Sequence, residues 1–313
     1  MSNDRFFELP EPGDIRAAAR RIAPHVHRTP VMQTDALVKG RTVAVKLENT
    51  QKTGTFKARG AFNTLLSSDV PAAGIVAASG GNHGAAVAHA AAALGINARI
   101  YVPEISGAAK VALIRESGAD LRIVPGAYAD AFAASEAYRA KTGAMSIHAY
   151  DGFGTLTGQG TLMAEWEEQG LAADTVLIAV GGGGLIGGAL AWLRGRRKVV
   201  AVESEGTATL HTALHDGPDA QIEVSGIAAD ALGARRIGRA CYDMAKAQGV
   251  TSVLVTDEAI AEAQSALWSG LRQYVEPAGA TALAALRSGA YSPAKDETLA
   301  ILVCGANPAI APL

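Results

Sequence analysis

Short runs of aliphatic and β-branched residues alternate along the chain with longer segments in which apolar residues recur every three or four positions. Runs of the first kind are typical of buried strands, and segments of the second kind are typical of amphipathic helices. Because strands that alternate with helices pair in parallel and bury both faces of their sheet, the pattern predicts an α/β fold. Strands are expected at residues 43–47, 74–78, 98–102, 120–124, 175–180, 198–202, 252–255 and 299–303.

The helical segments and the breaks between them predict how the chain divides. Helices are expected at residues 15–22, 57–66, 85–94, 108–117, 129–142, 162–169, 189–194, 208–215, 257–269 and 279–288. The pattern is interrupted near residues 67–73, which include Pro71, and near residues 148–158, where glycine and aromatic residues cluster. We therefore predict a larger lobe built from residues 1–70 and 148–313 and a smaller, mobile lobe built from residues 71–147.

Composition indicates the class of protein but does not identify its function. The chain has 313 residues, of which 49% are hydrophobic and 35 are glycine, which is typical of α/β enzymes rich in tight turns. Its net charge of −2 gives no electrostatic reason to expect nucleic acid or a membrane surface as a partner. Cys241 and Cys304 lack metal-ligand spacing. With neither a signal-peptide pattern nor an apolar run approaching the ~18 residues of a membrane span, a cytoplasmic protein is expected.

The first candidate site is the polar glycine-rich sequence SGGNHG at residues 79–84, hereafter the 79–84 turn. It follows a predicted strand and precedes an alanine-rich helix. Unpaired backbone N–H groups and the helix dipole both point at such a turn, which makes it a binding site for an anion, either a carboxylate or a phosphate.

A second candidate is the run of four glycines at residues 181–184, hereafter the glycine loop, which lies between a predicted strand and a helix. Successive glycines let backbone amides surround a phosphate. Gly182, Gly184 and Gly187 also match the pattern G-x-G-x-x-G, with Glu203 at the end of the next strand, so an NAD(P)-dependent oxidoreductase is an alternative. Against it, the pattern begins past the middle of the chain and leaves Lys57 unexplained.

Lys57 is the candidate nucleophile. It follows the turn formed by Thr53, Gly54 and Thr55 and lies in the first turn of a predicted helix. A helix N-terminus and partial burial beside Phe56 both disfavour the ammonium form and lower the pKa. An amine in this position can form a Schiff base with an aldehyde cofactor.

Four motifs occur in order between about residues 28 and 307: TFKARG at 55–60, SGGNHG at 79–84, GGGG at 181–184 and LVCGAN at 302–307. In these the chain resembles the fold-type-II enzymes that use pyridoxal 5′-phosphate, the tryptophan synthase β-like fold. Among them it is most similar to the threonine/serine dehydratases (ammonia-lyases) and the related serine racemases. The resemblance implies two lobes, each with a mainly parallel open sheet flanked by helices, and a homodimer.

The resemblance also assigns roles to residues. Lys57 would carry the cofactor as an internal aldimine and act in catalysis. The other residues of the cofactor site would be Phe56, Asn82, Gly181, Gly182, Gly183, Gly184, Leu185, Glu276 and Cys304. The substrate carboxylate would be bound by Ser79, Gly81, Asn82 and His83. No metal is expected, because only Glu203 is acidic among the positions that match a cation site in some relatives.

The activity implied is dehydration and deamination of an L-3-hydroxy amino acid, L-threonine or L-serine, to a 2-oxo acid and ammonia. Phenylserine, 3-hydroxyaspartate and a compatible-solute catabolite are alternative substrates; Arg235 or Arg236 would recognise the second carboxylate of 3-hydroxyaspartate. An amino-acid racemase is a further alternative. It is disfavoured because Gly80 stands where racemases have the serine that protonates the opposite face of Cα. A ligand-binding relative without catalysis also remains open.

Overall fold

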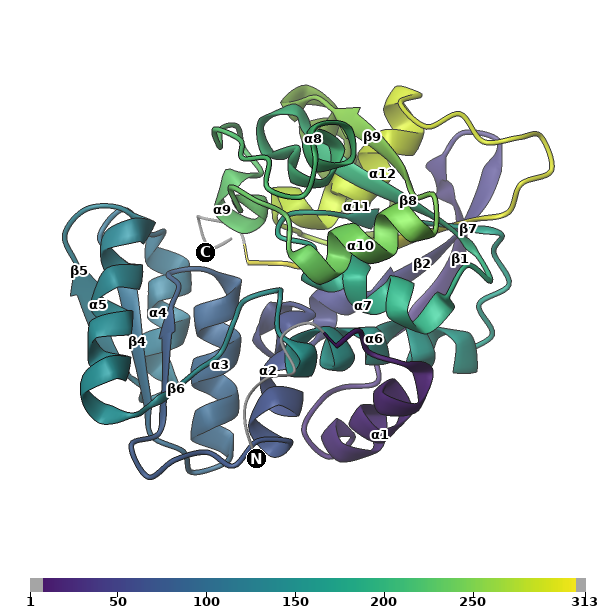
Figure 1. The fold of residues 1–313 in the computed structure, drawn as a ribbon. Helices are drawn as coiled ribbons and strands as arrows, with labels where there is room; N and C mark the ends of the chain where they lie inside the picture. The colour runs from purple at the N-terminus through teal and green to yellow at the C-terminus, as the bar shows by residue number, and fades with distance from the viewer. Residues whose placement is uncertain (1–7, 308–313) are drawn as a thin grey trace.

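The computed structural model describes residues 8–307 and contains two open sheets in two lobes (Figure 1). One sheet has six strands in the order β1-β2-β10-β7-β8-β9, and the other has four in the order β5-β4-β3-β6. Every pairing is parallel except that of β1 with β2. The strands are β1 Val31–Val38, β2 Arg41–Leu47, β3 Ile75–Ala78, β4 Ala98–Pro103, β5 Asp120–Val124, β6 Met145–Ser146, β7 Thr175–Ala179, β8 Lys198–Ser204, β9 Thr251–Val255 and β10 Leu299–Val303.

Helices cover both sheets. In the large lobe α11 and α12 pack together, with α12 against β7 to β10, while α6, α7 and α10 form a second helical layer that contacts the sheet through α7 (Figure 1). The α-helices are α1 Pro12–Ile22, α2 Lys57–Leu66, α3 Asn82–Ala93, α4 Ala108–Glu116, α5 Tyr128–Thr142, α6 Phe153–Glu168, α7 Gly184–Leu193, α8 Thr209–Asp216, α9 Ala229–Leu232, α10 Arg239–Ala247, α11 Asp257–Leu271 and α12 Pro277–Ser288. Short 3-10 helices lie at Glu48–Thr50, Lys52–Gly54 and Glu205–Thr207.

The four-stranded sheet is built from residues inside the range 71–147 and the six-stranded sheet from residues outside it. Helix α2 belongs to residues 1–70, yet its Ala58 and Phe62 pack in one apolar cluster with α3 and the four-stranded sheet. The helix that begins with Lys57 is therefore packed against both lobes. The lobe boundaries and the mobility of the smaller lobe stay predictions.

Glycines bring α6 into close contact with α2 and α7. A Cβ added at Gly158 would lie 2.6 Å from Gly60 Cα, and one at Gly188 would lie 2.5 Å from the backbone nitrogen of Gly160. Such close helix packing needs residues without side chains. It also explains why the expected helix at 162–169 is too short: the glycine-rich segment before it is helical from Phe153.

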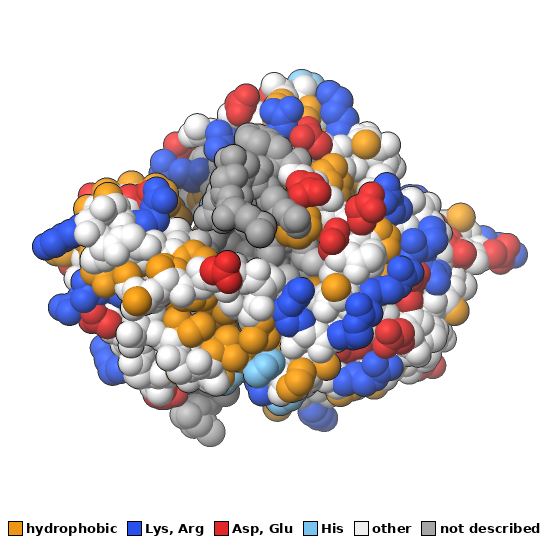
Figure 2. All heavy atoms as spheres, turned by 60° about the horizontal axis from the view of Figure 1, so that its bottom comes forward, with side chains coloured by type: hydrophobic (Ala, Val, Ile, Leu, Met, Phe, Trp, Pro, Cys, Tyr) orange, Lys and Arg blue, Asp and Glu red, His pale blue; other side chains and the backbone are white. Residues whose placement is uncertain are grey.

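The predicted strands and helices are present, with ends that differ by a few residues apart from the start of α6. Strands β1 and β6 and helices α9 and α10 were not expected. On the face shown in Figure 2, acidic and basic side chains mingle over the large lobe, and hydrophobic side chains gather on the part belonging to the small lobe. No helix within residues 8–307 is both long and apolar enough to cross a membrane.

Candidate active site

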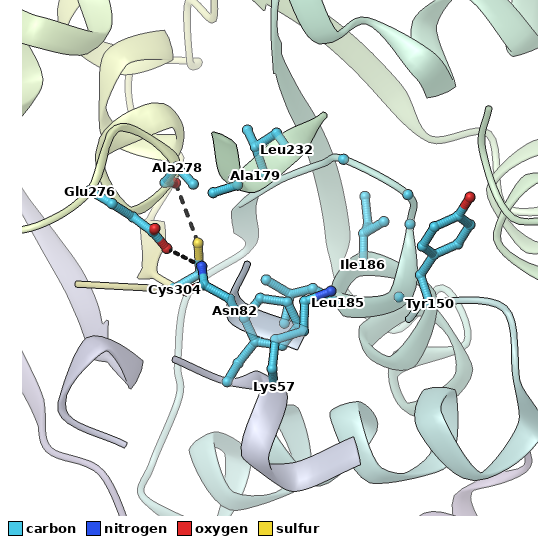
Figure 3. Close-up of a pocket in the computed structure, with 16 residues that line it drawn as sticks. Lys57, Asn82, Tyr150, Ala179, Leu185, Ile186, Leu232, Glu276, Ala278 and Cys304 are labelled. Atoms are coloured by element: carbon cyan, nitrogen blue, oxygen red, sulfur yellow. Dashed lines mark hydrogen bonds between the residues drawn. The ribbon is translucent and has the colours of Figure 1, made fainter. Parts of the chain in front are cut away.

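A pocket with an empty volume of ≈ 460 Å³, open solvent at its mouth included, lies beyond the carboxyl ends of β7 and β10 (Figure 3). It brings together the start of α2, the start of α3, the glycine loop, helix α9 and the residues around Glu276 and Cys304. Of the predicted cofactor residues, all of Phe56, Lys57, Asn82, Gly181, Gly182, Gly183, Gly184, Leu185, Glu276 and Cys304 line it. Segments far apart in the sequence thus meet where an open parallel sheet binds its ligand.

The glycine loop presents unpaired amides to this pocket. No backbone N–H from Gly181 to Ile186 donates a hydrogen bond to another residue of the range 8–307, and the first amide of the turn that is paired is that of Gly187, which bonds Gly183 O at 2.8 Å. Gly183 has φ +93, a conformation that favours glycine. The loop opens the ten-residue helix α7, so free amides and the helix dipole coincide. This is a site that fits a phosphate group.

Lys57 points into the pocket from the first residue of α2 (Figure 3). Its Nζ donates to the carbonyl oxygen of Ala149 at 3.1 Å and lies 5.4 Å from the centre of the Phe56 ring. Burial lowers the pKa of Lys57 to about 8, although the nearby carboxylate of Glu276 acts in the opposite direction. About a tenth of the lysine population is therefore neutral amine at pH 7, far more than for an ordinary lysine, and the neutral amine is the nucleophilic form.

The 79–84 turn offers a second set of free amides at the start of α3. The backbone N–H groups of Gly80, Asn82, His83 and Gly84 donate to no other residue in the described part of the chain, while Gly81 N donates to Ser79 Oγ at 3.2 Å. The ring nitrogen Nε2 of His83 is not available to donate to a carboxylate, because it lies 2.9 Å from Ile147 O. Burial, followed by the charge of Lys57, lowers the pKa of His83 to about 3, so the ring is neutral and Nε2–H donates. His83 can therefore reach a carboxylate only through its backbone.

Asn82 and Glu276 form a buried pair across the pocket (Figure 3). Asn82 Nδ2 donates to Glu276 Oε1 at 2.7 Å, and Asn82 Oδ1 accepts from Asn307 Nδ2 at 3.0 Å. One N–H of Asn82 remains for a ligand, as contact with a ring oxygen would require. The other oxygen of Glu276 lies 3.0 Å from Lys110 Nζ. Lys110 was missed at the sequence level; its signal is a lysine in the first turn of a helix, where the dipole disfavours a cation.

Cys304 keeps its proton. Its Sγ donates to Ala278 O at 3.3 Å (Figure 3), and burial raises the pKa of the thiol above its usual value. The pocket wall opposite the glycine loop therefore carries a neutral, weakly acidic group. Tyr150, on the other side, lies over Gly182 and closes the pocket there.

Glu203 and the two candidate arginines lie outside the pocket. Glu203 is buried and accepts bonds from Leu210 N and His211 N, both at 2.8 Å, and from Ser252 Oγ at 3.1 Å. Within residues 8–307 no cluster of three or more His, Cys, Asp or Glu residues is placed to hold a metal. Arg235 and Arg236 are exposed, with Glu223 at 3.7 Å and Asp219 at 3.6 Å as their nearest acids.

The pocket combines a buried amine, a glycine loop with free amides and Asn82 at the start of α3, an arrangement that fits a phosphorylated carbonyl cofactor. The comparisons agree: the chain belongs to the family described as "pyridoxal-phosphate dependent enzyme", whose model matches residues 22–305. The cofactor expected from the resemblance is thereby confirmed. The oxidoreductase alternative is wrong for this chain.

Three relatives place the chain within the family. It is 35% identical over 306 residues to a phenylserine dehydratase of Ralstonia pickettii, covering 96% of this chain and 94% of that protein. It is 33% identical over 301 residues to an L-threonine ammonia-lyase of Thermotoga maritima, covering 94% and 75% respectively. The structure of maize serine racemase has a TM-score of 0.88 at 33% identity, covering 96% of this chain and 94% of that one. These likenesses confirm the fold-type-II architecture.

Proposed function

We propose that this protein is a pyridoxal-phosphate dependent ammonia-lyase that converts an L-3-hydroxy amino acid to a 2-oxo acid and ammonia. The observation that carries the proposal is the arrangement of the Lys57 amine between two sets of free helix N-terminal amides. One set suits the cofactor phosphate and the other the substrate carboxylate. L-Threonine and L-serine are the first candidate substrates. Phenylserine joins them because a phenylserine dehydratase is among the relatives.

Bound pyridoxal phosphate supplies an electron sink that acidifies the Cα–H bond and allows the β-hydroxyl to leave. In this assignment the glycine loop and Leu185 would bind the phosphate, and Phe56 would pack against the ring. Asn82 would donate its free N–H to a ring oxygen. Cys304 presents a protonated thiol, already bonded to Ala278 O, so it does not place a negative charge beside the ring nitrogen. A site of this kind would hold the pyridine nitrogen of the cofactor without a charged partner.

Lys57 is the proposed acid/base. Its Nζ is held by Ala149 O and is half-neutral near pH 8, so it can accept the proton from Cα of the substrate. Ser79 and the free amides of Asn82 and His83 would fix the substrate carboxylate, with the Gly81 N–H, which donates to Ser79 Oγ, holding that hydroxyl in place; this would orient Cα toward the Lys57 nitrogen. The neutral His83 ring takes no part in proton transfer, since its Nε2–H is bonded to Ile147 O.

A panel of L-threonine, L-serine, phenylserine and 3-hydroxyaspartate, assayed for 2-oxo acid and ammonia, tests the proposal. We expect equal amounts of the two products from at least one of the hydroxy amino acids and none from L-alanine, which has no β-hydroxyl. Absence of both products from all four substrates by protein loaded with cofactor would contradict it.

Racemisation is the second candidate, because a solved serine racemase is among the similar structures. Chiral chromatography of the unreacted substrate distinguishes the two reactions. We expect ammonia to form much faster than the D-enantiomer, because Gly80 has no side chain. Comparable rates would favour the racemase.

We also propose a homodimer and a cytoplasmic location, as the family resemblance and the sequence suggest. Light scattering of the purified protein would reveal a monomer if the first is wrong, and fractionation of the source cells tests the second. The smaller lobe, residues 71–147, is proposed to move relative to the rest.

A further inference from the structure

Lys110 is a completely buried lysine whose charge, among the residues that the structure describes, is balanced by carboxylates of two other segments. It lies in the first turn of α4, in the small lobe, and its side chain is 0% exposed. Its Nζ is 2.5 Å from Asp230 Oδ2 of α9 and 3.0 Å from Glu276 Oε2, which precedes α12. The helix dipole at this position disfavours a cation. The two carboxylates therefore account for the burial of Lys110, and burial of an unpaired lysine would be costly.

Helix α9 lies against both anion-binding turns. A Cβ added at Gly181 would lie 2.8 Å from Leu232 Cα, and one at Gly81 would lie 3.6 Å from Asp230 O. Leu232 and Ala231 line the pocket directly. Figure 1 places α9 on the side of the large lobe that faces the small lobe. A four-residue helix has little stability of its own, so its position depends on contacts such as the one from Asp230 to Lys110.

Glu276 contacts the small lobe through a hydrogen bond at one oxygen and an ion pair at the other. Oε1 accepts from Asn82 Nδ2, and Oε2 accepts no hydrogen bond from the described residues, with Lys110 as its charged neighbour. The Glu276 side chain is 2% exposed and acts electrostatically on Lys57. Lys110 is thus linked electrostatically to the amine of Lys57 through the carboxylate of Glu276.

We propose that Lys110 is a positioning residue. Through Asp230 it holds α9 beside the pocket, and through its charge it keeps Glu276 in contact with Asn82, so that one buried cation connects both lobes at the site. The consequence for catalysis rests on the proposed function. When the contacts of Lys110 are lost, substrate binding weakens because α9 separates from the 79–84 turn. The structural part is independent of the reaction.

Three single variants of the holoenzyme test it: Asp230→Asn, Lys110→Met and, as a control, Lys141→Met, which changes an exposed lysine of the same lobe. Hydrogen exchange of peptides covering residues 226–234 is the first measurement. A charged hydrogen bond is commonly worth a factor of about ten or more in an equilibrium, so we expect exchange about tenfold faster in the first two variants and unchanged in the control. Wild-type exchange in both Asp230→Asn and Lys110→Met would overturn the proposal.

Steady-state kinetics with the best substrate of the panel is the second measurement. In Asp230→Asn we expect KM to rise by about tenfold with a smaller change in kcat, because Glu276 keeps its partner. In Lys110→Met kcat falls as well, and adding Glu276→Gln restores part of the lost thermal stability by removing the unpaired buried charge. A double variant no more stable than Lys110→Met contradicts the charge coupling. If Lys110→Met does not fold, hydrogen exchange in Asp230→Asn decides the proposal. If the protein catalyses a different reaction, hydrogen exchange still tests whether the contacts of Lys110 hold α9 in place.

Discussion

The lowered pKa of Lys57 predicts how fast the protein without cofactor takes up pyridoxal phosphate at different pH. Only the neutral amine attacks the aldehyde. With a pKa of about 8, roughly a tenth of the Lys57 side chains are neutral at pH 7, and about nine tenths are neutral at pH 9. The uptake rate should therefore rise by about tenfold across this interval and level off above pH 9. The lowered pKa places the change near pH 8, because burial favours the uncharged form in the folded protein.

An ordinary lysine behaves differently, which makes the experiment decisive. With an unshifted pKa near 10.5, the neutral fraction rises by about a hundredfold between pH 7 and pH 9 and does not level off there. Stopped-flow absorbance of apoprotein mixed with cofactor gives the rates, and an N-acetyl-lysine amide run in parallel corrects for titration of the cofactor itself. Circular dichroism checks that the fold is constant over the range.

The cause of the shift can be tested in the same assay. Glu276 raises the pKa of Lys57, so Glu276→Gln should move the midpoint of the uptake profile to lower pH. A corrected wild-type profile that still climbs steeply at pH 9 would refute the reasoning from burial. An unchanged midpoint in Glu276→Gln would refute the electrostatic link between the two residues.

The remaining predictions concern packing around the site. Gly183→Val should weaken cofactor binding in a titration and also lower the melting temperature, because its Cβ would lie 2.7 Å from Cys241 Sγ beneath the loop; unchanged affinity argues against the phosphate role. Gly80→Ser alone should not produce racemisation, because Ser106 fills the space that the new side chain needs; combining it with Ser106→Gly makes that space available. Chiral chromatography checks both variants, and racemisation by the single variant would contradict this packing. Lys46, in β2, is buried and its Nζ lies 2.5 Å from Glu165 Oε1, while Arg59 lies 3.0 Å from the other oxygen of that carboxylate; Lys46→Met should therefore cost about 1–3 kcal/mol in denaturant unfolding, since Glu165 keeps one cationic partner, and a loss below about 0.5 kcal/mol would show that this ion pair is dispensable.

The sequence predicted those strands and helices whose hydrophobic pattern is visible within the segment itself. Strand β10, Leu299–Val303, is a continuous apolar run and was expected at the observed residues. Strand β1, Val31–Val38, carries polar residues on an edge and is formed by antiparallel pairing with β2, which no local pattern records. Helix α9, Ala229–Leu232, is four residues long and depends on the segments it contacts.

The site was predictable as far as its motifs are contiguous. Lys57, the 79–84 turn and the glycine loop are short sequences with a direct physical meaning, and Lys57, Asn82 of the turn and the glycine loop line one pocket. The contact of Lys110 with Asp230 and Glu276 joins residues that are far apart in the chain; Glu276 was expected at the site, but Lys110 and Asp230 have the pattern of ordinary surface charges. Only the fold brings them together. The hydrogen bond from the His83 ring to Ile147 O could not be predicted either, because any residue can supply a backbone carbonyl.

The central claim is that Lys57 bonds pyridoxal phosphate covalently in this pocket. Borohydride reduction of the loaded protein, followed by peptide mass spectrometry, tests it most directly, with Lys57→Ala as the matched variant. The account predicts one modified peptide, containing Lys57, and a folded Lys57→Ala protein with neither the modification nor the cofactor absorbance band. Modification at another lysine, or an unchanged band and normal turnover in Lys57→Ala, would contradict it.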